Sequence, residues 1–222
     1  MLHDKKMEGG TLPFLLARGI GQTYLDKTVD LKAVAADKEA NEMGRRLYLT
    51  YCMQCHGSDA KGSKGFPNLA DSDWLWGGEP ERVLETVLDG RNAAMPALGG
   101  VLGDDGVAET AVYVQKLAGG PVDPALASRG ERRFATLCAA CHGADGKGNP
   151  ALGAPNLTDD TWLYGGDLAA ITQTIRDGRD GAMPAHRTLI GEPRARLAVA
   201  WVLSGAGSAA PAAGAGTPPQ SP

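Results

Sequence analysis

A short motif that occurs twice restricts the possible folds of this chain more than any other feature. Cys-Met-Gln-Cys-His at residues 52–56 recurs as Cys-Ala-Ala-Cys-His at residues 138–142. The two motifs contain all four cysteines of the 222-residue chain, which leaves none for a disulfide elsewhere. The cysteines therefore indicate a chemical role for the two motifs rather than a disulfide framework.

The motifs belong to a longer internal repeat, which sets the domain organisation. Pro-Asn-Leu, Trp-Leu-Trp/Tyr-Gly-Gly and Gly-Arg-x-x-Ala-Met-Pro-Ala recur in the same order in both halves. We predict an N-terminal arm, two domains and a disordered tail of Ala, Gly and Pro, at residues 1–40, 41–120, 121–205 and 206–222. The arm is expected to pack on a neighbouring protein or on the first domain.

Helical patterns surround the motifs and repeat with them. In the helix predicted before the first motif, Met43, Leu47 and Tyr51 share one face. Proline or aspartate at the start and glycine at the end mark a middle helix in each domain. The helices expected after the motifs span about 80–90, 107–117, 167–178 and 194–203. No alternating strand pattern occurs, so the predicted fold is all-α, with a few helices around a bound group in each domain.

Cys-x-x-Cys followed by His is the attachment motif of a c-type haem. The two thiols add to the haem vinyl groups, and the histidine binds the iron. The residues concerned are Cys52, Cys55, His56, Cys138, Cys141 and His142. A zinc site or a redox-active dithiol are the alternatives, but a histidine follows each pair at once. The prediction is two covalently attached haem c groups.

Methionines at matched positions are the candidates for the sixth iron ligand. Among six methionines, only Met95 and Met183 recur in register, each before Pro-Ala. Core packing is the alternative role for both, and His186 is a rival ligand for the second haem. Iron held by His and Met has no vacant position, which predicts electron exchange without a substrate site.

Each domain resembles a class I cytochrome c. The resemblance implies that the first and last helices of each domain cross, with a glycine and aromatic rings at the contact. The residues are Gly44, Tyr48 and Tyr113 in the first domain and Gly130, Phe134 and Trp201 in the second. It also implies that the carbonyls of Pro67 and Pro155 accept hydrogen bonds from the proximal histidines.

The tandem, over about residues 20–205, resembles the dihaem CcoP/FixP subunits of cbb3-type cytochrome c oxidases. The resemblance is carried by His-Gly-Ser-Asp-Ala-Lys-Gly, Gly-Phe-Pro-Asn-Leu and above all Trp-Leu-Trp-Gly-Gly. It implies a periplasmic electron-entry subunit at the inner membrane of a Gram-negative bacterium. Expected partners are a donor cytochrome c or bc complex and the monohaem and catalytic oxidase subunits. A free soluble dihaem shuttle and a haem sensor are the alternatives.

Four further side chains are candidates for contacts with haem propionates. Trp74 and Trp162 would donate through their indole N–H groups, with plain core packing as the alternative. Arg91 and Arg179 would pair by charge, with an ordinary surface arginine as the alternative.

Charge and hydropathy exclude a nucleic-acid-binding surface and show one departure from the resembled family. The formal net charge is −4 with both signs interspersed, so no basic surface for nucleic acid is expected. No apolar run approaches the roughly 18 residues of a membrane span. The family resembled has an N-terminal anchor, so the missing span departs from its pattern. His3 is expected to be an ordinary surface residue.

Overall fold

The structure, a computed structural model, describes residues 16–19, 22–24 and 30–205. Most of the predicted arm, with His3, and the predicted tail 206–222 lie outside the described residues. Within the arm, β1 (Leu16–Gly19) pairs with β2 (Gln22–Tyr24) in an antiparallel sheet. The short helix α1 (Leu31–Ala36) then begins at Asp30, whose carboxylate accepts a hydrogen bond from the Lys32 N–H at 3.0 Å.

Helices dominate the described residues and confirm the all-α class. After α1 they are α2 (Lys38–Tyr51), α3 (Met53–His56), α4 (Pro80–Asp89), α5 (Gly99–Leu117), α6 (Pro124–Leu137), α7 (Ala139–His142), α8 (Leu168–Asp177) and α9 (Arg187–Leu203). Two further strands, β3 (Arg91–Met95) and β4 (Arg179–Met183), follow α4 and α8. The local sequence pattern does not predict these strands, because each is stabilised by its partner from the other repeat.

The predicted helix ends are largely confirmed. Pro80 opens α4, and Gly90 ends it with a positive φ of 73°. Asp167 caps α8 by accepting a hydrogen bond from the Ala170 N–H at 2.9 Å. Helices α5 and α9 begin earlier than predicted, because a short first segment precedes a kink at Gly103 in one and at Gly191 in the other.

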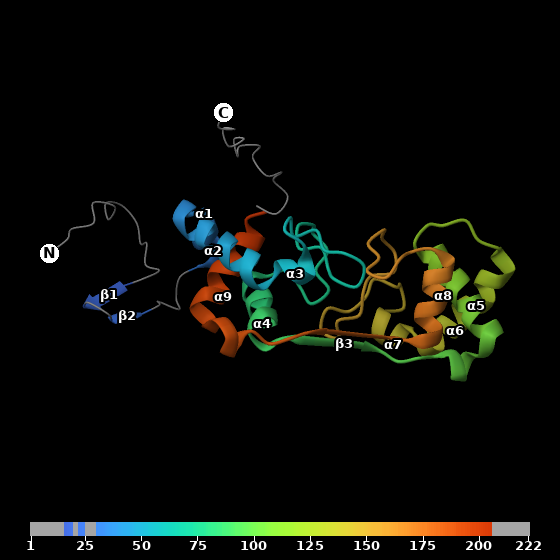
Figure 1. Cartoon of the computed structure of the whole chain (residues 1–222). Coiled ribbons are helices and arrows are strands. Elements are labelled where there is room, and N and C mark those ends of the chain that lie inside the picture. Colours follow the sequence, from blue (N-terminus) through green and yellow to red (C-terminus); the bar gives the residue numbers. More distant parts are fainter. Residues whose placement is uncertain (1–15, 20–21, 25–29, 206–222) are drawn as a thin grey trace, which may run out of the picture.

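The last helix of each repeat packs against helices of the other repeat, whereas the resemblance predicts that it packs within its own. Helix α9 packs on α1, α2 and α4, whereas α5 packs on α6 and α8. Figure 1 shows α9 beside the blue α1 and α2, and α5 at the opposite end of the molecule. We call α1–α4 with α9 the His56 unit, and α5–α8 the His142 unit. The expected contact of Tyr48 with Tyr113 is wrong, since the Tyr48 ring packs against the Trp201 ring, with centroids 4.5 Å apart.

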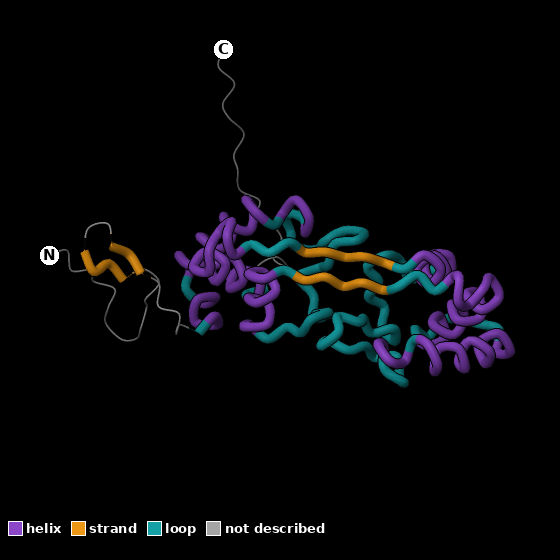
Figure 2. The backbone as a smooth tube through the Cα atoms, turned by 90° about the horizontal axis from the view of Figure 1, so that it is seen from below, coloured by secondary structure: helices purple, strands orange, loops and turns teal. Residues whose placement is uncertain are grey.

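A two-stranded ribbon carries the chain between the two units. Strand β3 leads from α4 to α5, and β4 returns from α8 to α9. The strands are antiparallel, so that Arg91 lies opposite Met183 and Met95 lies opposite Arg179. Figure 2 shows them running side by side between two groups of helices. This ribbon is where the two copies of the repeat exchange their last helices.

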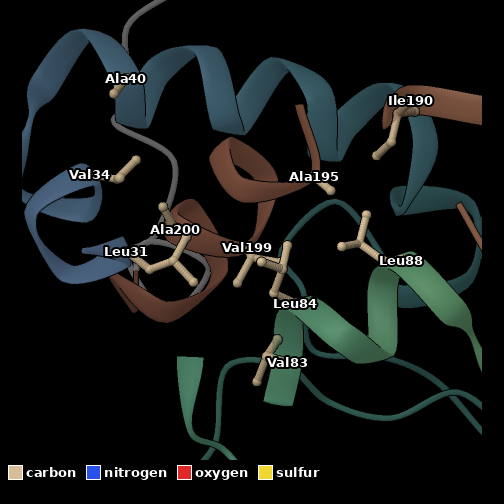
Figure 3. Packing of buried hydrophobic residues seen from close by; sticks show 10 residues of the cluster. All are labelled: Leu31, Val34, Ala40, Val83, Leu84, Leu88, Ile190, Ala195, Val199 and Ala200. Carbon is tan, nitrogen blue, oxygen red and sulfur yellow. The ribbon is translucent and has the colours of Figure 1, made fainter. Parts of the chain in front are cut away.

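Each unit has its own hydrophobic core, and each core draws on both repeats. In the His56 unit, Leu31, Leu84 and Val199 come together from α1, α4 and α9, as Figure 3 shows. In the His142 unit, Val107 of α5 packs with Phe134 of α6 and Ile171 of α8. A fully buried aliphatic side chain contributes roughly 1.5–3 kcal/mol. The exchanged helices are therefore integral to the cores that they join.

The buried face of α2 differs by one position from the predicted one. Ala40, Gly44 and Tyr48 are buried, whereas Met43, Leu47 and Tyr51 are only partly covered. Gly44 faces α9 so closely that a Cβ there would overlap the Leu197 carbonyl oxygen. The close approach of two helix backbones at this glycine thus sets which face of α2 turns inward.

The loops that follow the two Cys-x-x-Cys-His motifs also meet. The Gly65 N–H donates a hydrogen bond to the Leu163 carbonyl at 2.9 Å. The ring of Trp76 lies against Gly153, at which a Cβ would overlap it. These contacts bring the two motif-bearing loops together. Among the described helices, none has both the length and the apolar character needed to cross a membrane.

Candidate functional site

A break between two helices positions each Cys-x-x-Cys-His motif. Helix α2 ends at Cys52, whose N–H still donates to the Tyr48 carbonyl at 2.8 Å, and α3 starts at the next residue. The His56 N–H then donates to the Cys52 carbonyl at 3.0 Å. The second motif repeats this arrangement at the junction of α6 and α7. One helical turn therefore fixes two thiols and an imidazole together in each unit.

Both imidazoles are buried and oriented by a proline carbonyl. His56 and His142 are each 8% exposed. The Nδ1 of His56 lies 2.9 Å from the Pro67 oxygen, and that of His142 lies 3.1 Å from the Pro155 oxygen. A carbonyl only accepts, so Nδ1 carries the proton and Nε2 keeps its lone pair. This is the tautomer that a metal-binding histidine needs, and both implied hydrogen bonds are present.

Burial acts on the titration of His56 and of the thiols. It lowers the pKa of His56, against the Pro67 hydrogen bond, which raises it; nearby His186 lowers it further. Burial also raises the pKa of Cys52 to about 11 and that of Cys138 to about 11, with the second cysteine of each pair adding to the effect. Dithiol oxidoreductases instead lower the pKa of their reactive cysteine. The redox-dithiol alternative is therefore disfavoured.

The zinc alternative is not supported either. All four cysteines are free thiols, and the two pairs belong to different units. In the part of the chain that the structure describes, no group of three or more His, Cys, Asp or Glu side chains is placed to hold a metal ion. The cysteine pairs thus do not converge on a shared four-cysteine site.

The two candidate methionines lie at opposite ends of the β3–β4 ribbon. Met95 packs against the core of the His142 unit, and Met183 is the last residue of β4, at the end of the strand that lies against Gly90 of the His56 unit. The expectation that each methionine lies in the unit formed by its own repeat is wrong. The reason is the same exchange that moves α5 and α9. Their role as iron ligands stays a prediction.

His186 does not lie where a rival ligand for the second haem should be. Its backbone N–H donates to the Val87 carbonyl of α4 at 3.0 Å, which places it in the His56 unit. Its Nδ1 lies 2.8 Å from the Pro184 oxygen. His186 is thus excluded as a ligand in the His142 unit.

The two candidate arginines have matched and specific surroundings. Arg91 Nε donates to Thr86 Oγ1 at 2.9 Å, and its guanidinium lies 5.1 Å from the centre of the Trp76 ring. Arg179 does the same with Thr174 Oγ1 at 3.0 Å and the Tyr164 ring at 4.5 Å. Neither is an ordinary surface arginine. Sequence reasoning missed the threonines and these rings, although they too recur in register.

Arg91 also has spare hydrogen-bonding capacity. Its Nη2 is buried without a hydrogen-bond partner, although it forms an ion pair with Glu85 Oε2 at 3.3 Å. A buried guanidinium N–H usually finds an acceptor. A carboxylate of a bound group would satisfy this atom, in agreement with the predicted propionate contact, which stays a prediction.

The two candidate tryptophans show at least the packing role. Trp74 packs against the core of the His56 unit, and Trp162 against that of the His142 unit. Gly78 and Gly166 lie so close to these rings that a Cβ would come within 2.6 Å of them. This approach explains the second glycine of each Gly-Gly pair, and the first, Gly77 or Gly165, has a positive φ. A contact between either indole N–H and a propionate stays a prediction.

These residues together fit a covalently attached haem in each unit. Each unit offers two free thiols and a buried imidazole whose Nε2 lone pair is available. A partly buried methionine thioether lies at the matching end of the ribbon. In the His56 unit, the buried Nη2 of Arg91 has an ion pair with Glu85 but no hydrogen-bond partner.

Comparisons with known proteins agree with this donor set. The family described as cytochrome c oxidase, cbb3-type, subunit III matches residues 39–114 and again residues 125–202. The chain is 42% identical over 188 residues to the cbb3-type cytochrome c oxidase subunit CcoP of Cereibacter sphaeroides, covering 78% of this chain and 65% of that protein.

Two FixP subunits show the same likeness. The chain is 36% identical over 209 residues to the cbb3-type cytochrome c oxidase subunit FixP of Sinorhizobium medicae, covering 90% of this chain and 70% of that protein. It is 44% identical over 155 residues to that of Azorhizobium caulinodans, covering 66% and 53%. The chain thus spans between about half and 70% of these relatives. It belongs to the cbb3-type cytochrome c oxidase subunit III family and, as a c-type cytochrome, carries covalently bound haem c.

Proposed function

We propose that the chain binds two haem c groups and passes single electrons toward the oxygen-reducing subunit of a cbb3-type oxidase. The main support for this proposal is that the same arrangement of two cysteines and a buried histidine occurs twice, in a member of this family. In both units a pair of free thiols adjoins a buried imidazole, held by a carbonyl 2.9 or 3.1 Å from Nδ1. A six-coordinate haem c supplies one-electron exchange between ferric and ferrous iron.

The protein's own residues would have three tasks in this function. The cysteines would hold each haem by thioether bonds, and His56 and His142 would bind iron through Nε2. Met95 and Met183 would close the sixth positions, which keeps oxygen away from both irons. Arg91 and Arg179, with Trp74 and Trp162, would contact the propionates, Arg91 through its buried Nη2.

The meeting of the two loops supports transfer between the haems. The Gly65 to Leu163 hydrogen bond and the contact of Trp76 with Gly153 join the segments that follow the two motifs. One electron would enter from a reduced donor, a cytochrome c or a bc complex, and the same electron would leave to the monohaem subunit. No proton has to move in this step, and the donor is oxidised by one electron. The site would face the periplasm at the inner membrane.

Haem content is the first test of this proposal. The chain, produced together with a cytochrome c maturation system, should contain two haems by mass spectrometry and by alkaline pyridine spectra. Cys52→Ala with Cys55→Ala should remove one haem and leave the other. A chain that carries one haem or none when both motifs are intact would contradict the proposal.

Isolation of the native assembly is the second test. A tagged chain extracted from membranes should copurify with the monohaem and catalytic subunits of an oxidase. Electron flow from a reduced cytochrome c to oxygen should then depend on this chain. Recovery of the tagged protein solely as a free protein would instead identify a dihaem shuttle and overturn the oxidase assignment.

A further inference from the structure

We infer that the two methionine ligands are exchanged between the repeats, so that Met183 ligates the haem bound at His56 and Met95 ligates the haem bound at His142. This inference rests on the proposed haem function and goes beyond it. Matching positions in the two repeats would predict the opposite pairing. The exchange follows from the path of the backbone between the units.

The segment around Met183 is attached to the His56 unit. A Cβ on Gly90, at the end of α4, would come within 2.5 Å of the Met183 carbonyl oxygen and 2.8 Å of the Ala185 nitrogen. Gly90 has a φ of 73° and no side chain, which permits this approach. The His186 N–H continues the attachment by donating to the Val87 carbonyl of α4 at 3.0 Å. Met183 is therefore held at the end of the unit that contains His56.

The segment around Met95 is attached in the same way to the His142 unit. The Met95 carbonyl oxygen lies against Gly178, at the end of α8. The Leu98 N–H donates to the Ile175 carbonyl of α8 at 3.0 Å. The Met95 side chain packs against the core cluster that contains Cys138, which is itself an attachment cysteine of the second motif. Met95 thus belongs to the surroundings of the second motif.

The ribbon between these points separates each methionine from the histidine of its own repeat. The register places Met95 opposite Arg179 and Met183 opposite Arg91, so the two methionines lie at opposite ends. Four steps along an antiparallel strand cover roughly 13–14 Å. For Met95 to ligate the haem at His56, the β3–β4 pairing would have to open and α5 would have to leave α6 and α8.

The alternation of partly buried and exposed side chains along β3 and β4 shows which face of the ribbon carries the methionines. Arg91, Ala93 and Met95 are partly buried, whereas Asn92 and Ala94 are exposed. Strand β4 shows the same alternation, with Met183 partly buried. Each methionine therefore shares the covered face of the ribbon with the arginine of the other repeat, at the end where its haem is expected.

Single-haem versions of the full chain test the exchange. Cys138→Ala with Cys141→Ala leaves only the haem at His56, and Cys52→Ala with Cys55→Ala leaves only the haem at His142. Met95→Ala and Met183→Ala are then placed separately in each version. The readouts are the ferric spin state, the sulfur-to-iron charge-transfer band and the reduction potential.

Exchange predicts a reciprocal result. With the haem at His56, Met183→Ala should convert the iron to high spin, abolish the band and lower the potential, while Met95→Ala leaves all three unchanged. With the haem at His142, the roles should reverse. If each methionine instead acts on the haem of its own repeat, the inference is overturned and the proposed ligands stand. If neither variant changes either haem, the proposed methionine ligation itself fails.

A measurement on the intact dihaem chain guards against misfolding of the single-haem versions. In the reduced protein, nuclear Overhauser contacts link a ligating methionine methyl to the haem that it binds. Each haem is assigned through its thioether protons to Cys52 or to Cys138, and each methyl through Met95→Leu or Met183→Leu. Contact of the Met183 methyl with the haem on Cys52 supports exchange, and contact with the haem on Cys138 overturns it.

Discussion

Two glycines show at the scale of single residues how the exchanged helices come so close. Gly44 on α2 faces α9, and Gly130 on α6 faces α5. A Cβ at Gly44 would overlap the Leu197 carbonyl oxygen, and one at Gly130 would overlap that of Glu109. A backbone carbonyl within a helix cannot move aside without disturbing its hydrogen bonds. The absence of a side chain is therefore a condition for both crossings.

Gly44→Ala should destabilise the His56 unit. Overpacking of a tight contact costs roughly 1–3 kcal/mol, because helices have to shift apart. Guanidinium unfolding followed by circular dichroism measures the loss. Gly100→Ala is the matched control, since a Cβ at Gly100 has no atom within 4 Å and should leave stability unchanged or slightly higher. Equal stability of the Gly44→Ala chain and the wild type would contradict the crossing described here.

The ion pairs of Glu109 predict how the stability of the protein depends on pH. Its carboxylate accepts hydrogen bonds from Arg129 and from Arg133, the latter at 2.7 Å, and these hold the pKa of Glu109 below its usual 4.5. A lowered folded-state pKa gives a stability contribution that is full above about pH 4.5 and is lost as the pH falls through the folded value. Glu109→Gln should therefore lower Tm at neutral pH, and the gap from wild type should close in acid. A gap that stays constant at all pH values would show that the ion pairs are not its source.

At the scale of elements, the exchange replaces one aromatic pairing by another. The Tyr48 and Trp201 rings join α2 to α9, and the Tyr113 and Phe134 rings join α5 to α6, with centroids 4.5 and 5.3 Å apart. Tyr48 also donates its hydroxyl to the Gly57 carbonyl at 2.7 Å, next to the first motif. Each crossing thus connects a motif-bearing helix to the last helix of the other repeat.

A double-mutant cycle in the full chain measures this pairing. Tyr48→Leu and Trp201→Leu should show a coupling free energy of roughly 0.5–1.5 kcal/mol, as expected for aromatic rings in contact. The matched control combines Tyr48→Leu with Tyr113→Leu and should show no coupling. Coupling in the control and none in the first pair would mean that each repeat keeps its own last helix.

At the scale of the whole molecule, the His56 unit depends on the distant end of the chain, because α9 completes it. Residues 187–203 complete the core around Leu31, Leu84 and Val199, whereas the His142 unit is formed by the continuous stretch from α5 to α8. The two units are joined by the ribbon and by the contacts of the motif-bearing loops. The molecule is therefore two interlocked units rather than two consecutive ones.

Truncation after Ala185 should affect the unit that is further away in sequence. Without α9, the His56 unit loses most of one core wall and should become sensitive to protease between residues 38 and 89, while residues 98–178 stay protected. Limited proteolysis with mass spectrometry measures this pattern. Trp201→Ala in the full chain is the milder companion variant. Protease sensitivity confined to residues 124–178 would contradict the exchange.

Much of this arrangement was predictable, because local patterns determine it. The repeat, the ends of α4 and α8 and the motif residues follow from short-range signals. The proline carbonyls at His56 and His142 follow from the resemblance to class I cytochromes c. The choice of helix partner does not, since α5 and α9 each present an aromatic residue at the matched position, Tyr113 and Trp201. The hydrophobic pattern predicts which helix faces are buried, but not which of the two repeats provides the helix that covers them. The domain boundaries at 41–120 and 121–205 remain proposals about the sequence repeats.

The ribbon that exchanges the last helices also has a consequence for maturation. A chain that crosses the inner membrane starting at its N-terminus reaches the periplasm segment by segment, and domains usually fold as they appear. The His142 unit can close once α8 has emerged, but the His56 unit has to wait for α9 at residues 187–203. The first motif to be made is thus the last to be enclosed. The enzymes that attach haem would meet it as an open segment, and the repeat made second would be the first to mature.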